Sequence, residues 1–432
     1  MKKLFLNGKP LASLRIVYGA SPLNRSVGSQ TGKTVGEDIG RFLQGENRTC
    51  DFDLQSARRL AECMEALTGE KPMLLSSLDA QLQSGDILVG NVGLAGLPAD
   101  ERDYFCCMDE IGEHLLVCGG SFGATWHAVG ALCKALENAT DGSELSDVLP
   151  IEGRAPLRTV ACLGDSITRG SQSLPDGNGF GTPDGLTASF GGAATSIYFE
   201  QYMSYPSNLQ RALWKEYLVF NFGRGLATMR DLNPDPATGP FYYQRTPAYA
   251  KCKSYSDRPD FSFDAVLIML GTNDSGRDGG AKTWGEEQRA DYCNEARALI
   301  ASLASGSPEA RFVLMTVPHN CDSHKISENS ATLRVLQREC VKMLCKEGFD
   351  LSCYDMGAYS ADHLGNGHGA TKEEEIEAHA DFYNIRTETG KPDTTHPNYM
   401  GYAMIAKGME PLLRCLLEGA EAPGYLLDSA SL

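Results

Sequence analysis

Hydrophobic and polar positions follow a regular pattern only in the second part of the chain. After residue 156, short apolar runs typical of buried strands are separated by longer stretches whose apolar residues recur at helical spacing. Strands followed by helices in this order predict right-handed crossovers and a parallel sheet with helices on both faces. The predicted strands are 157–163, 218–222, 265–270, 312–317 and 351–354, and the predicted helices are 206–217, 286–303, 333–344 and 397–417.

The pattern before residue 150 is less regular and mixes strands with helices. It predicts a smaller α/β or α+β domain over residues 1–150 and a larger domain over residues 151–432. The stretch 150–156 is short, mostly polar and bracketed by prolines, which predicts a linker between the two domains. In the smaller domain the predicted strands are 14–18, 87–89 and 115–118, and the predicted helices are 51–67 and 124–136.

Composition and charge narrow the range of functions. The 432 residues are 42% hydrophobic and 22% charged, and no apolar run is long enough to span a bilayer, so we expect a soluble globular protein. A formal net charge of -17 repels nucleic-acid phosphates and anionic lipids, so we expect neither nucleic acid nor membrane as a partner and favour a neutral substrate. The first apolar run ends after three residues, which is too short for a signal peptide and favours a cytoplasmic location.

The cysteines and most of the histidines do not predict a cofactor. Several of the 14 cysteines lie inside apolar runs and no Cys-x-x-Cys pair occurs, so we expect free thiols rather than a zinc site or disulfides. His319, Asp322 and His324 could together bind a metal ion, but a polar loop is the simpler interpretation. We therefore expect no metal and no cofactor.

Two segments of the smaller domain are similar to functional motifs, but we interpret both as structural. The stretch 28–34 is like a phosphate-binding loop, but three residues instead of four separate its glycines, which favours a polar loop. The stretch 119–123 has the Gly-x-Ser-x-Gly pattern of a nucleophile elbow around Ser121. Only His127 follows nearby, on the predicted helix itself, so we interpret Ser121 as part of a packed turn.

Four polar segments of the larger domain are candidates for one active site. The segments 164–166, 221–225 and 271–274 directly follow three predicted strands, and the segment 393–396 precedes the last predicted helix. Because the carboxyl ends of parallel strands lie along one edge of a sheet, we expect the first three segments to be neighbours. They supply a serine and hydrogen-bond donors, and the fourth supplies an aspartate and a histidine.

These residue types fit nucleophilic catalysis. A serine hydroxyl is a weak nucleophile at neutral pH and needs a base such as histidine, which an aspartate can orient. Glycine N–H groups and an asparagine amide can stabilise the negative oxygen of a tetrahedral intermediate. Structural alternatives exist for each: Ser166 could cap a helix, Asp393 could cap the last helix, and Asn273 could form an Asx turn.

With all four segments present in this order, residues 157–418 resemble the SGNH or GDSL hydrolase family. The resemblance implies a flavodoxin-like three-layer α/β/α domain with a parallel sheet, preceded by the smaller α/β domain. By position it implies that Ser166 is the nucleophile, His396 the base and Asp393 the acid that orients the base. Asp355 is an alternative orienting acid, although family members commonly carry an acid there that is not part of the triad.

The resemblance also implies an oxyanion hole, formed by the Ser166 and Gly223 N–H groups and the Asn273 side-chain amide. The family's second segment often reads Asn-x-Gly-x-x-Gly, whereas here glycine returns one residue early, at Gly225. Either Gly223 or Gly225 could therefore present its N–H to the substrate. Arg224 lies between them and could contact the substrate or be solvated.

A second resemblance concerns the smaller domain. Residues 71–137 resemble the small α/β domain that precedes the catalytic module in some glycoside hydrolases, such as α-glucuronidases and hexosaminidases. The similarity rests on the stretches 87–91, 115–120 and 124–132. It implies a carbohydrate context and assigns no catalytic residue.

Taken together, the two resemblances imply a serine esterase that removes a small acyl group, acetate, from a small-molecule or oligosaccharide ester. A lipase or thioesterase for longer chains, and a carbohydrate-binding protein with an unused triad, remain alternatives. We expect Arg224, Asp274 and Trp284 to contact the substrate. Phe180 and Tyr198 lie in a long irregular stretch and could form a sugar-sized pocket or a packed lid.

Overall fold

The computed structural model describes the chain in ten stretches and divides it into two compact units. Unit 1 comprises Met1–Arg158 and Leu213–Leu218, and unit 2 comprises Thr159–Ala212 and Val219–Leu432. For 324–327, 383–384, 393–394 and 399 the description covers the backbone alone. The described residues are 1–19, 52–77, 79–92, 98–109, 113–170, 204–232, 241–318, 324–364, 383–384 and 393–427.

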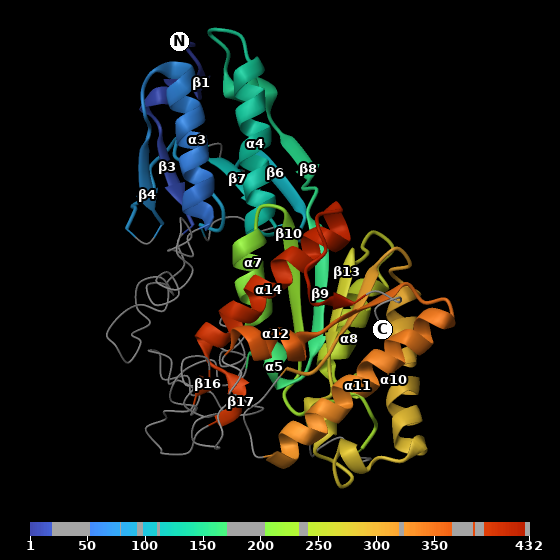
Figure 1. Cartoon of the computed structure of the whole chain (residues 1–432). Helices are drawn as coiled ribbons and strands as arrows, with labels where there is room; N and C mark the ends of the chain where they lie inside the picture. Colours follow the sequence, from blue (N-terminus) through green and yellow to red (C-terminus); the bar gives the residue numbers. More distant parts are fainter. Residues whose placement is uncertain are drawn as a thin grey trace. The chain divides into compact units, whose positions relative to one another are not determined.

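Unit 1 has a six-stranded sheet with two helices packed on it (Figure 1). In spatial order the strands are β4 (Met73–Ser76), β3 (Arg15–Tyr18), β5 (Ile87–Val89), β7 (Leu115–Gly119), β6 (Asp103–Met108) and β8 (Ile151–Arg154), and the helices are α3 (Phe52–Thr68) and α4 (Phe122–Asn138). The first four strands run parallel, whereas β6 pairs antiparallel with β7 and β8. Apolar residues of both helices, such as Leu60 and Leu132, share one core cluster with Ile16, Ile87 and Val117 of the strands.

Short elements complete unit 1. They are the paired strands β1 (Phe5–Leu6) and β2 (Lys9–Pro10) and the 3-10 helices η1 (Leu11–Ser13) and η2 (Leu145–Val148).

The stretch 150–156, which we expected to be a linker, belongs largely to the sheet of unit 1. Its residues 151–154 form β8, in which Arg154 pairs with Asp103 across the ladder. Arg154 Nη2 also donates to Asp100 Oδ2 at 2.9 Å. The backbone hydrogen bonds and this ion pair therefore hold the stretch as an edge strand, and the chain first passes from unit 1 to unit 2 at Arg158–Thr159.

Unit 2 is organised around a second six-stranded sheet. In spatial order its strands are β10 (Tyr217–Gly223), β9 (Arg158–Gly164), β13 (Ala265–Met269), β14 (Arg311–Met315), β15 (Leu351–Tyr354) and β18 (Leu426–Leu427). Strands β9, β13, β14 and β15 are parallel, which confirms the predicted sheet. Strand β18 pairs antiparallel with β15 at the edge of the sheet, and a strand of two residues was too short to be predicted from the sequence. Bonds from Arg158 N–H to Glu216 O and from Arg224 N–H to Gly164 O show that β10 runs the same way as β9. The carboxyl ends of β10, β9 and β13 therefore lie along one edge.

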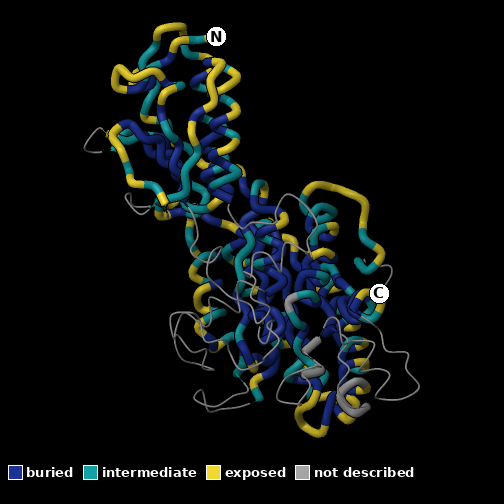
Figure 2. The backbone as a smooth tube through the Cα atoms, turned by 90° about the vertical axis from the view of Figure 1, so that its left-hand side faces the viewer, coloured by how far each residue is buried: buried dark blue, intermediate teal, exposed yellow. Residues whose placement is uncertain are grey.

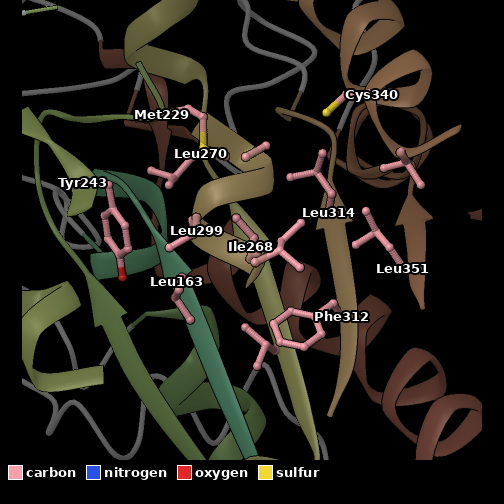
Figure 3. Close-up of a cluster of buried hydrophobic side chains, with 14 of the residues drawn as sticks. Leu163, Met229, Tyr243, Ile268, Leu270, Leu299, Phe312, Leu314, Cys340 and Leu351 are labelled. Carbon is pink, nitrogen blue, oxygen red and sulfur yellow. The ribbon is translucent and has the colours of Figure 1, made fainter. Parts of the chain in front are cut away.

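Helices cover the sheet of unit 2 and bury its strands (Figures 1 and 2). Alternate strand residues such as Ile268 and Leu314 share a core cluster with Leu299 and Cys340 from two of the helices (Figure 3). The intervening strand residues, such as Leu267, are buried as well, as expected for a sheet covered on both faces. The longer helices are α7 (Tyr205–Leu213), α8 (Pro247–Ser256), α10 (Glu286–Ala304), α11 (His324–Lys346), α12 (Met356–His363) and α14 (Tyr399–Glu418).

Short elements of unit 2 lie between these strands and helices. They are α5 (Ser166–Arg169), α9 (Thr272–Ser275), η3 (Tyr243–Arg245), η4 (Ala281–Thr283), the parallel pair β11 (Ala227–Thr228) and β12 (Phe241–Tyr242), and the antiparallel pair β16 (Tyr383–Asn384) and β17 (Asp393–Pro397).

The last helix was predicted to begin at Pro397 and begins two residues later, at Tyr399. Pro397 ends β17, and Asn398 is the N-cap of α14. The Asn398 side chain accepts hydrogen bonds from the N–H groups of Met400, at 2.9 Å, and Gly401, at 3.0 Å. A search of the described residues finds no helix both long enough and apolar enough to cross a membrane.

Candidate active site

Ser166 stands at a sharp turn between β9 and α5. A Cβ on Gly164 would lie 2.0 Å from Thr168 Oγ1 and 2.6 Å from Met269 O, so only glycine fits where the strand turns into the helix. Asp165 is the N-cap of α5, and its carboxylate accepts from Ile167 N–H at 2.9 Å. The turn therefore places the serine as the first residue of a short helix at the carboxyl edge of the sheet.

His396 reaches Ser166 from the other end of the chain. Its Nε2 lies 2.8 Å from Ser166 Oγ, within hydrogen-bond distance. His396 lies in β17, just before α14, and β17 contacts α5, the helix that begins with Ser166. The serine is 7% exposed. The structure thus brings together the two residues that the motif order predicted as nucleophile and base.

The orienting acid is only partly described. The Asp393 backbone lies in β17 and pairs with Asn384, while its side chain lies outside the described residues, so its role stays a prediction. The alternative acid, Asp355, has other partners. Its Oδ1 accepts from Thr316 Oγ1 at 2.9 Å and its Oδ2 from Arg338 Nη1 at 2.7 Å. Asp355 also caps α12, so its carboxylate is engaged in holding the ends of β14 and α12.

The two glycines of the second segment differ in what their N–H groups do. The Gly223 N–H donates to Asn221 Oδ1 at 2.9 Å, and a Cβ on Gly223 would lie 2.2 Å from Arg169 N. Close packing against α5 accounts for a glycine at position 223 and its N–H is already bonded, which favours Gly225 as the donor, and the role of Gly223 stays a prediction. The Gly225 N–H has no hydrogen-bond partner among the described residues, and the same holds for the N–H of Ser166.

Asn273 follows β13 on the short helix α9. Its Nδ2 donates to Ala227 O at 2.9 Å, which uses one of the two amide hydrogens and fixes the plane of the side chain. One hydrogen is left for a further acceptor. Asn221 similarly joins separate elements, since its Nδ2 donates to Ser204 Oγ at 3.0 Å.

Two fully buried carboxyl groups lie beneath this edge. Burial raises the pKa of Asp165 to about 6, although the Ile167 N–H and the charge of His396 act in the opposite direction. Burial also raises the pKa of Asp274 to about 7, and the charge of Asp165 adds to this increase. The N–H groups of Met229 and Arg230 lower it, because both donate to the Asp274 carboxylate.

One of the three residues expected to contact substrate is instead structural. Asp274 is 0% exposed and accepts from backbone N–H groups, so we correct that expectation. Trp284 is 7% exposed with its Nε1 donating to Arg277 O at 3.2 Å, and its role in substrate contact stays a prediction. Arg224 is half-buried with its guanidinium 4.5 Å from the centroid of the Phe241 ring, and burial lowers its pKa. Its role in substrate contact stays a prediction.

The sequence did not predict the side chains that surround Arg230. This guanidinium is 5% exposed, lies 4.6 Å from the centroid of the Trp284 ring, and forms ion pairs of 2.9 Å with Asp278 and Asp291. The residues come from an irregular stretch, a loop and a helix, so no local pattern joins them. The sequence indicated this group of side chains only through a charged residue, Arg230, shortly after the second polar segment.

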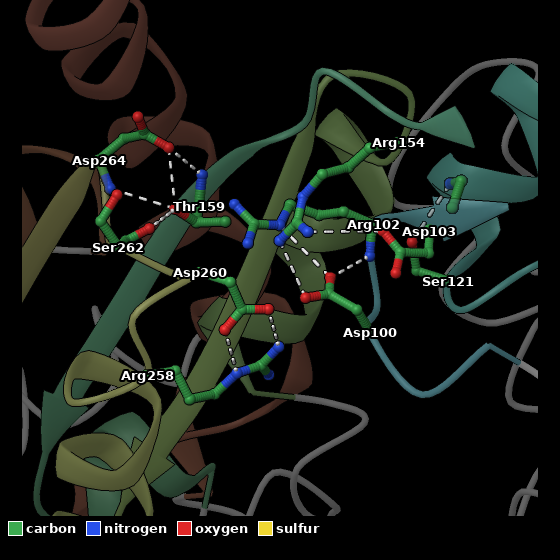
Figure 4. Close-up of polar contacts among 11 residues, drawn as sticks. Asp100, Arg102, Asp103, Ser121, Arg154, Thr159, Arg258, Asp260, Ser262 and Asp264 are labelled. Carbon is green, nitrogen blue, oxygen red and sulfur yellow. Dashed lines mark hydrogen bonds and ion pairs between the residues drawn. The ribbon is translucent and has the colours of Figure 1, made fainter. Parts of the chain in front are cut away.

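The remaining candidates lie apart from this constellation or outside the described residues. Ser121 is the N-cap of α4 and accepts from Ala124 N–H at 3.2 Å, as a packed turn predicts (Figure 4). Burial lowers the pKa of His127, whose Nε2 lies 3.2 Å from Lys215 O. Phe180, Tyr198, His319, Asp322 and the stretch 28–34 lie outside the described residues, and for His324 the backbone alone is described.

The described part of the chain holds neither a disulfide nor a cluster of metal-ligating side chains. The twelve cysteines found there are all free thiols. No group of three or more histidine, cysteine, aspartate or glutamate side chains with metal-binding geometry occurs among the described residues.

The family model described as GDSL-like lipase/acylhydrolase matches residues 162–404, more than half of the chain. No curated protein sequence matches. Similar solved structures include a carbohydrate esterase family 2 enzyme with a carbohydrate-binding domain from Corynascus thermopiles (Myceliophthora fergusii), which is 20% identical over 62% of this chain and 68% of that chain with a TM-score of 0.40.

Two bacterial structures are similar to the same extent. A family two carbohydrate esterase from Clostridium thermocellum, in complex with cellohexaose, is 16% identical over 62% of this chain and 68% of that chain, with a TM-score of 0.37. A carbohydrate acetylesterase family member from Sinorhizobium meliloti is 18% identical over 61% of this chain and 100% of that chain, with a TM-score of 0.36.

Proposed function

Because the chain belongs to the GDSL-like lipase/acylhydrolase family, we propose that it is a serine esterase that removes a small acyl group, acetyl, from a carbohydrate ester. The observation that carries the proposal is the distance of 2.8 Å between Ser166 Oγ and His396 Nε2. A hydroxyl and an imidazole in this contact form the core of a nucleophile–base pair.

In the first half of the reaction, Ser166 Oγ attacks the ester carbonyl while His396 Nε2 accepts the hydroxyl proton. The tetrahedral intermediate collapses, the bond to the alcohol oxygen breaks, and His396 returns the proton to the leaving alcohol. In the second half, His396 deprotonates a water molecule that attacks the acyl-serine, and the carboxylic acid leaves as Ser166 regains its proton. We propose Asp393, three residues before His396, as the acid that orients the imidazole.

The oxyanion hole combines backbone and side-chain donors. The Ser166 N–H is the first of α5, a helix position whose N–H has no acceptor within the helix. The Asn273 amide keeps one hydrogen after bonding Ala227 O, and we propose Gly225 rather than Gly223 as the third donor. Loss of one such donor costs on the order of a hundredfold in rate.

The polar surroundings of Ser166 favour a hydroxyl-rich alcohol and a short acyl group. The half-buried Arg224 follows β10 with its guanidinium 4.5 Å from the centroid of the Phe241 ring. Asn273 adds an amide with one hydrogen still available on the same edge of the sheet. Guanidinium and amide donors suit sugar hydroxyls better than they suit a long aliphatic chain.

Turnover of p-nitrophenyl acetate tests the chemistry. We expect S166A to lose activity by at least about a thousandfold, while S121A, the matched serine of unit 1, keeps the wild-type rate. Equal rates in S166A and wild type would refute the assignment.

A panel of p-nitrophenyl esters from acetate to palmitate, followed by acetylated sugars, tests the substrate. Activity is expected to fall with acyl length and acetate to be released from acetylated sugars. Activity that rises toward palmitate would instead indicate a lipase.

A further inference from the structure

Side chains of α9 bind a short segment that follows the second polar segment. Asn273 Nδ2 donates to Ala227 O at 2.9 Å, while Asp274 Oδ2 accepts from Met229 N–H at 2.9 Å and Asp274 Oδ1 from Arg230 N–H at 3.0 Å. Two consecutive side chains therefore hold three residues of the stretch 227–230. A carboxylate that accepts two backbone N–H groups fixes a segment more firmly than one contact, since charge-assisted hydrogen bonds are the stronger ones.

The segment held in this way includes the end of the turn that carries Gly225. Ala227 N–H donates to Arg224 O at 3.1 Å, which closes a tight turn around Gly225 and Leu226. Leu226 has a positive φ of 62°, a conformation that is strained for a leucine and persists only where its surroundings enforce it. Anchoring of Ala227 and the residues after it therefore determines where the Gly225 N–H points.

The buried carboxylate of Asp274 has a compensating charge. Arg230 is 5% exposed, and its positive charge stabilises the ionised form of Asp274. Asp278 and Asp291 hold the guanidinium in place through ion pairs of 2.9 Å. An isolated buried carboxylate would be strongly disfavoured, so this arrangement provides the charge that the two backbone bonds require.

We propose that Asp274 is a positioning residue of the oxyanion hole, whose ionised carboxylate fixes the Gly225 turn and the Asn273 amide relative to each other. Asp274 does not contact the substrate, because it is 0% exposed. The inference rests on the proposed esterase function and adds a residue that acts through the donors rather than on the ester.

The test compares D274N with D264N. Asp264 is the matched control, because its Oδ2 also accepts from a backbone N–H, that of Thr159 at 2.6 Å, but at the amino edge of the same strands (Figure 4). The side-chain amide introduced by D274N would present an NH2 group to one of the two backbone donors, so one of the two hydrogen bonds from Met229 N–H and Arg230 N–H would be lost. We expect D274N to lower kcat for p-nitrophenyl acetate by about 10- to 100-fold with KM within about twofold, and D264N to keep the wild-type kcat.

A boronic acid that forms a tetrahedral adduct with Ser166 provides a second readout. Its affinity for D274N should fall in parallel with kcat, because the adduct oxygen occupies the oxyanion hole, whereas the affinity for product acetate should be unchanged. A variant that had merely unfolded would lose affinity for the boronic acid and for acetate alike. If D274N does not fold, D274S, whose hydroxyl accepts from one N–H, is measured in its place under the same criteria.

The pH profile of kcat gives a third readout. The groups that interact electrostatically with Asp274 are Arg230, Asp165 and Tyr292. Since burial raises the pKa of Asp274 to about 7, its ionised form is lost as pH falls below neutrality, and the wild-type kcat should fall with it. In D274N this part of the acid limb should disappear.

Two outcomes would overturn the inference: a folded D274N with wild-type kcat, or equal losses of kcat in D274N and D264N. Absence of turnover in wild type above S166A would instead refute the proposed function itself, so the two failures can be told apart.

Discussion

Substitution of Gly223 by alanine should damage catalysis through α5, the helix that begins with Ser166. A Cβ at this position would lie 2.2 Å from Arg169 N, 2.6 Å from Arg169 Cα and 2.7 Å from the Thr168 carbonyl carbon. All three are backbone atoms, so no side chain can rotate away to make room. The strand end and the helix must separate by about 1 Å to reach ordinary contact distance.

A displacement of this size acts directly on the catalytic contact. Ser166 Oγ lies 2.8 Å from His396 Nε2, and a shift of about 1 Å in α5 would take the pair out of hydrogen-bond range. Misplacement by about 1 Å typically costs on the order of 100-fold in rate. Overpacking of a close contact costs about 1–3 kcal/mol of stability. We therefore expect G223A to fold, with a lowered Tm and a kcat about 100-fold below wild type.

The assay is hydrolysis of p-nitrophenyl acetate, together with thermal unfolding. The control is G276A, because a Cβ on Gly276 meets nothing within 4 Å, its φ of -96° suits any residue, and it follows α9 near the same edge of the sheet. G276A should keep wild-type kcat and Tm. A folded G223A with kcat within about twofold of wild type would refute the reasoning that links this glycine to the position of α5.

Three further predictions concern the residues around Ser166. N273A should lower kcat about 100-fold on the same ester, because one oxyanion donor is lost, and lower Tm slightly, because the bond to Ala227 O is lost as well; an unchanged kcat would contradict its role. D393N should lower kcat strongly, whereas D355N should lower mainly Tm, because the Asp355 carboxylate is bonded to Thr316 and Arg338. The reverse result would show that Asp355, and not Asp393, orients His396. Because burial raises the folded-state pKa of Asp165 to about 6, this carboxyl stabilises the fold fully below about pH 4 and its contribution is lost as pH rises through 6. The Tm difference between D165N and wild type should therefore change between about pH 4 and pH 7, and a constant difference would show that this pKa is not raised.

The parallel sheet of unit 2 could be predicted because its strands are buried on both faces. A strand such as β13, with five consecutive buried residues, reads as a continuous apolar run in the sequence. Strands β8 and β18 could not be predicted in the same way. β8 is an edge strand of alternating half-buried and exposed residues, and β18 has only two residues, so neither carries a recognisable pattern.

The candidate site could be predicted where its residues directly end a strand. Ser166 and Asn273 follow β9 and β13, and parallel topology alone places them on one edge. The difference between Gly223 and Gly225 depends on which N–H is already bonded, and that bond comes from the side chain of Asn221. The burial of Asp274 and Trp284 depends on Arg230 and its partners, whose spacing in sequence reflects no local periodicity.

Labelling with a fluorophosphonate tests the central claim, that Ser166 is a nucleophile activated by His396, most directly. The reagent phosphonylates an activated serine and releases fluoride, and peptide mass spectrometry identifies the modified residue. We predict a single adduct on Ser166 in the wild-type protein and loss of labelling in H396A. An adduct on Ser121, or labelling of Ser166 that is equally fast in H396A, would contradict the account.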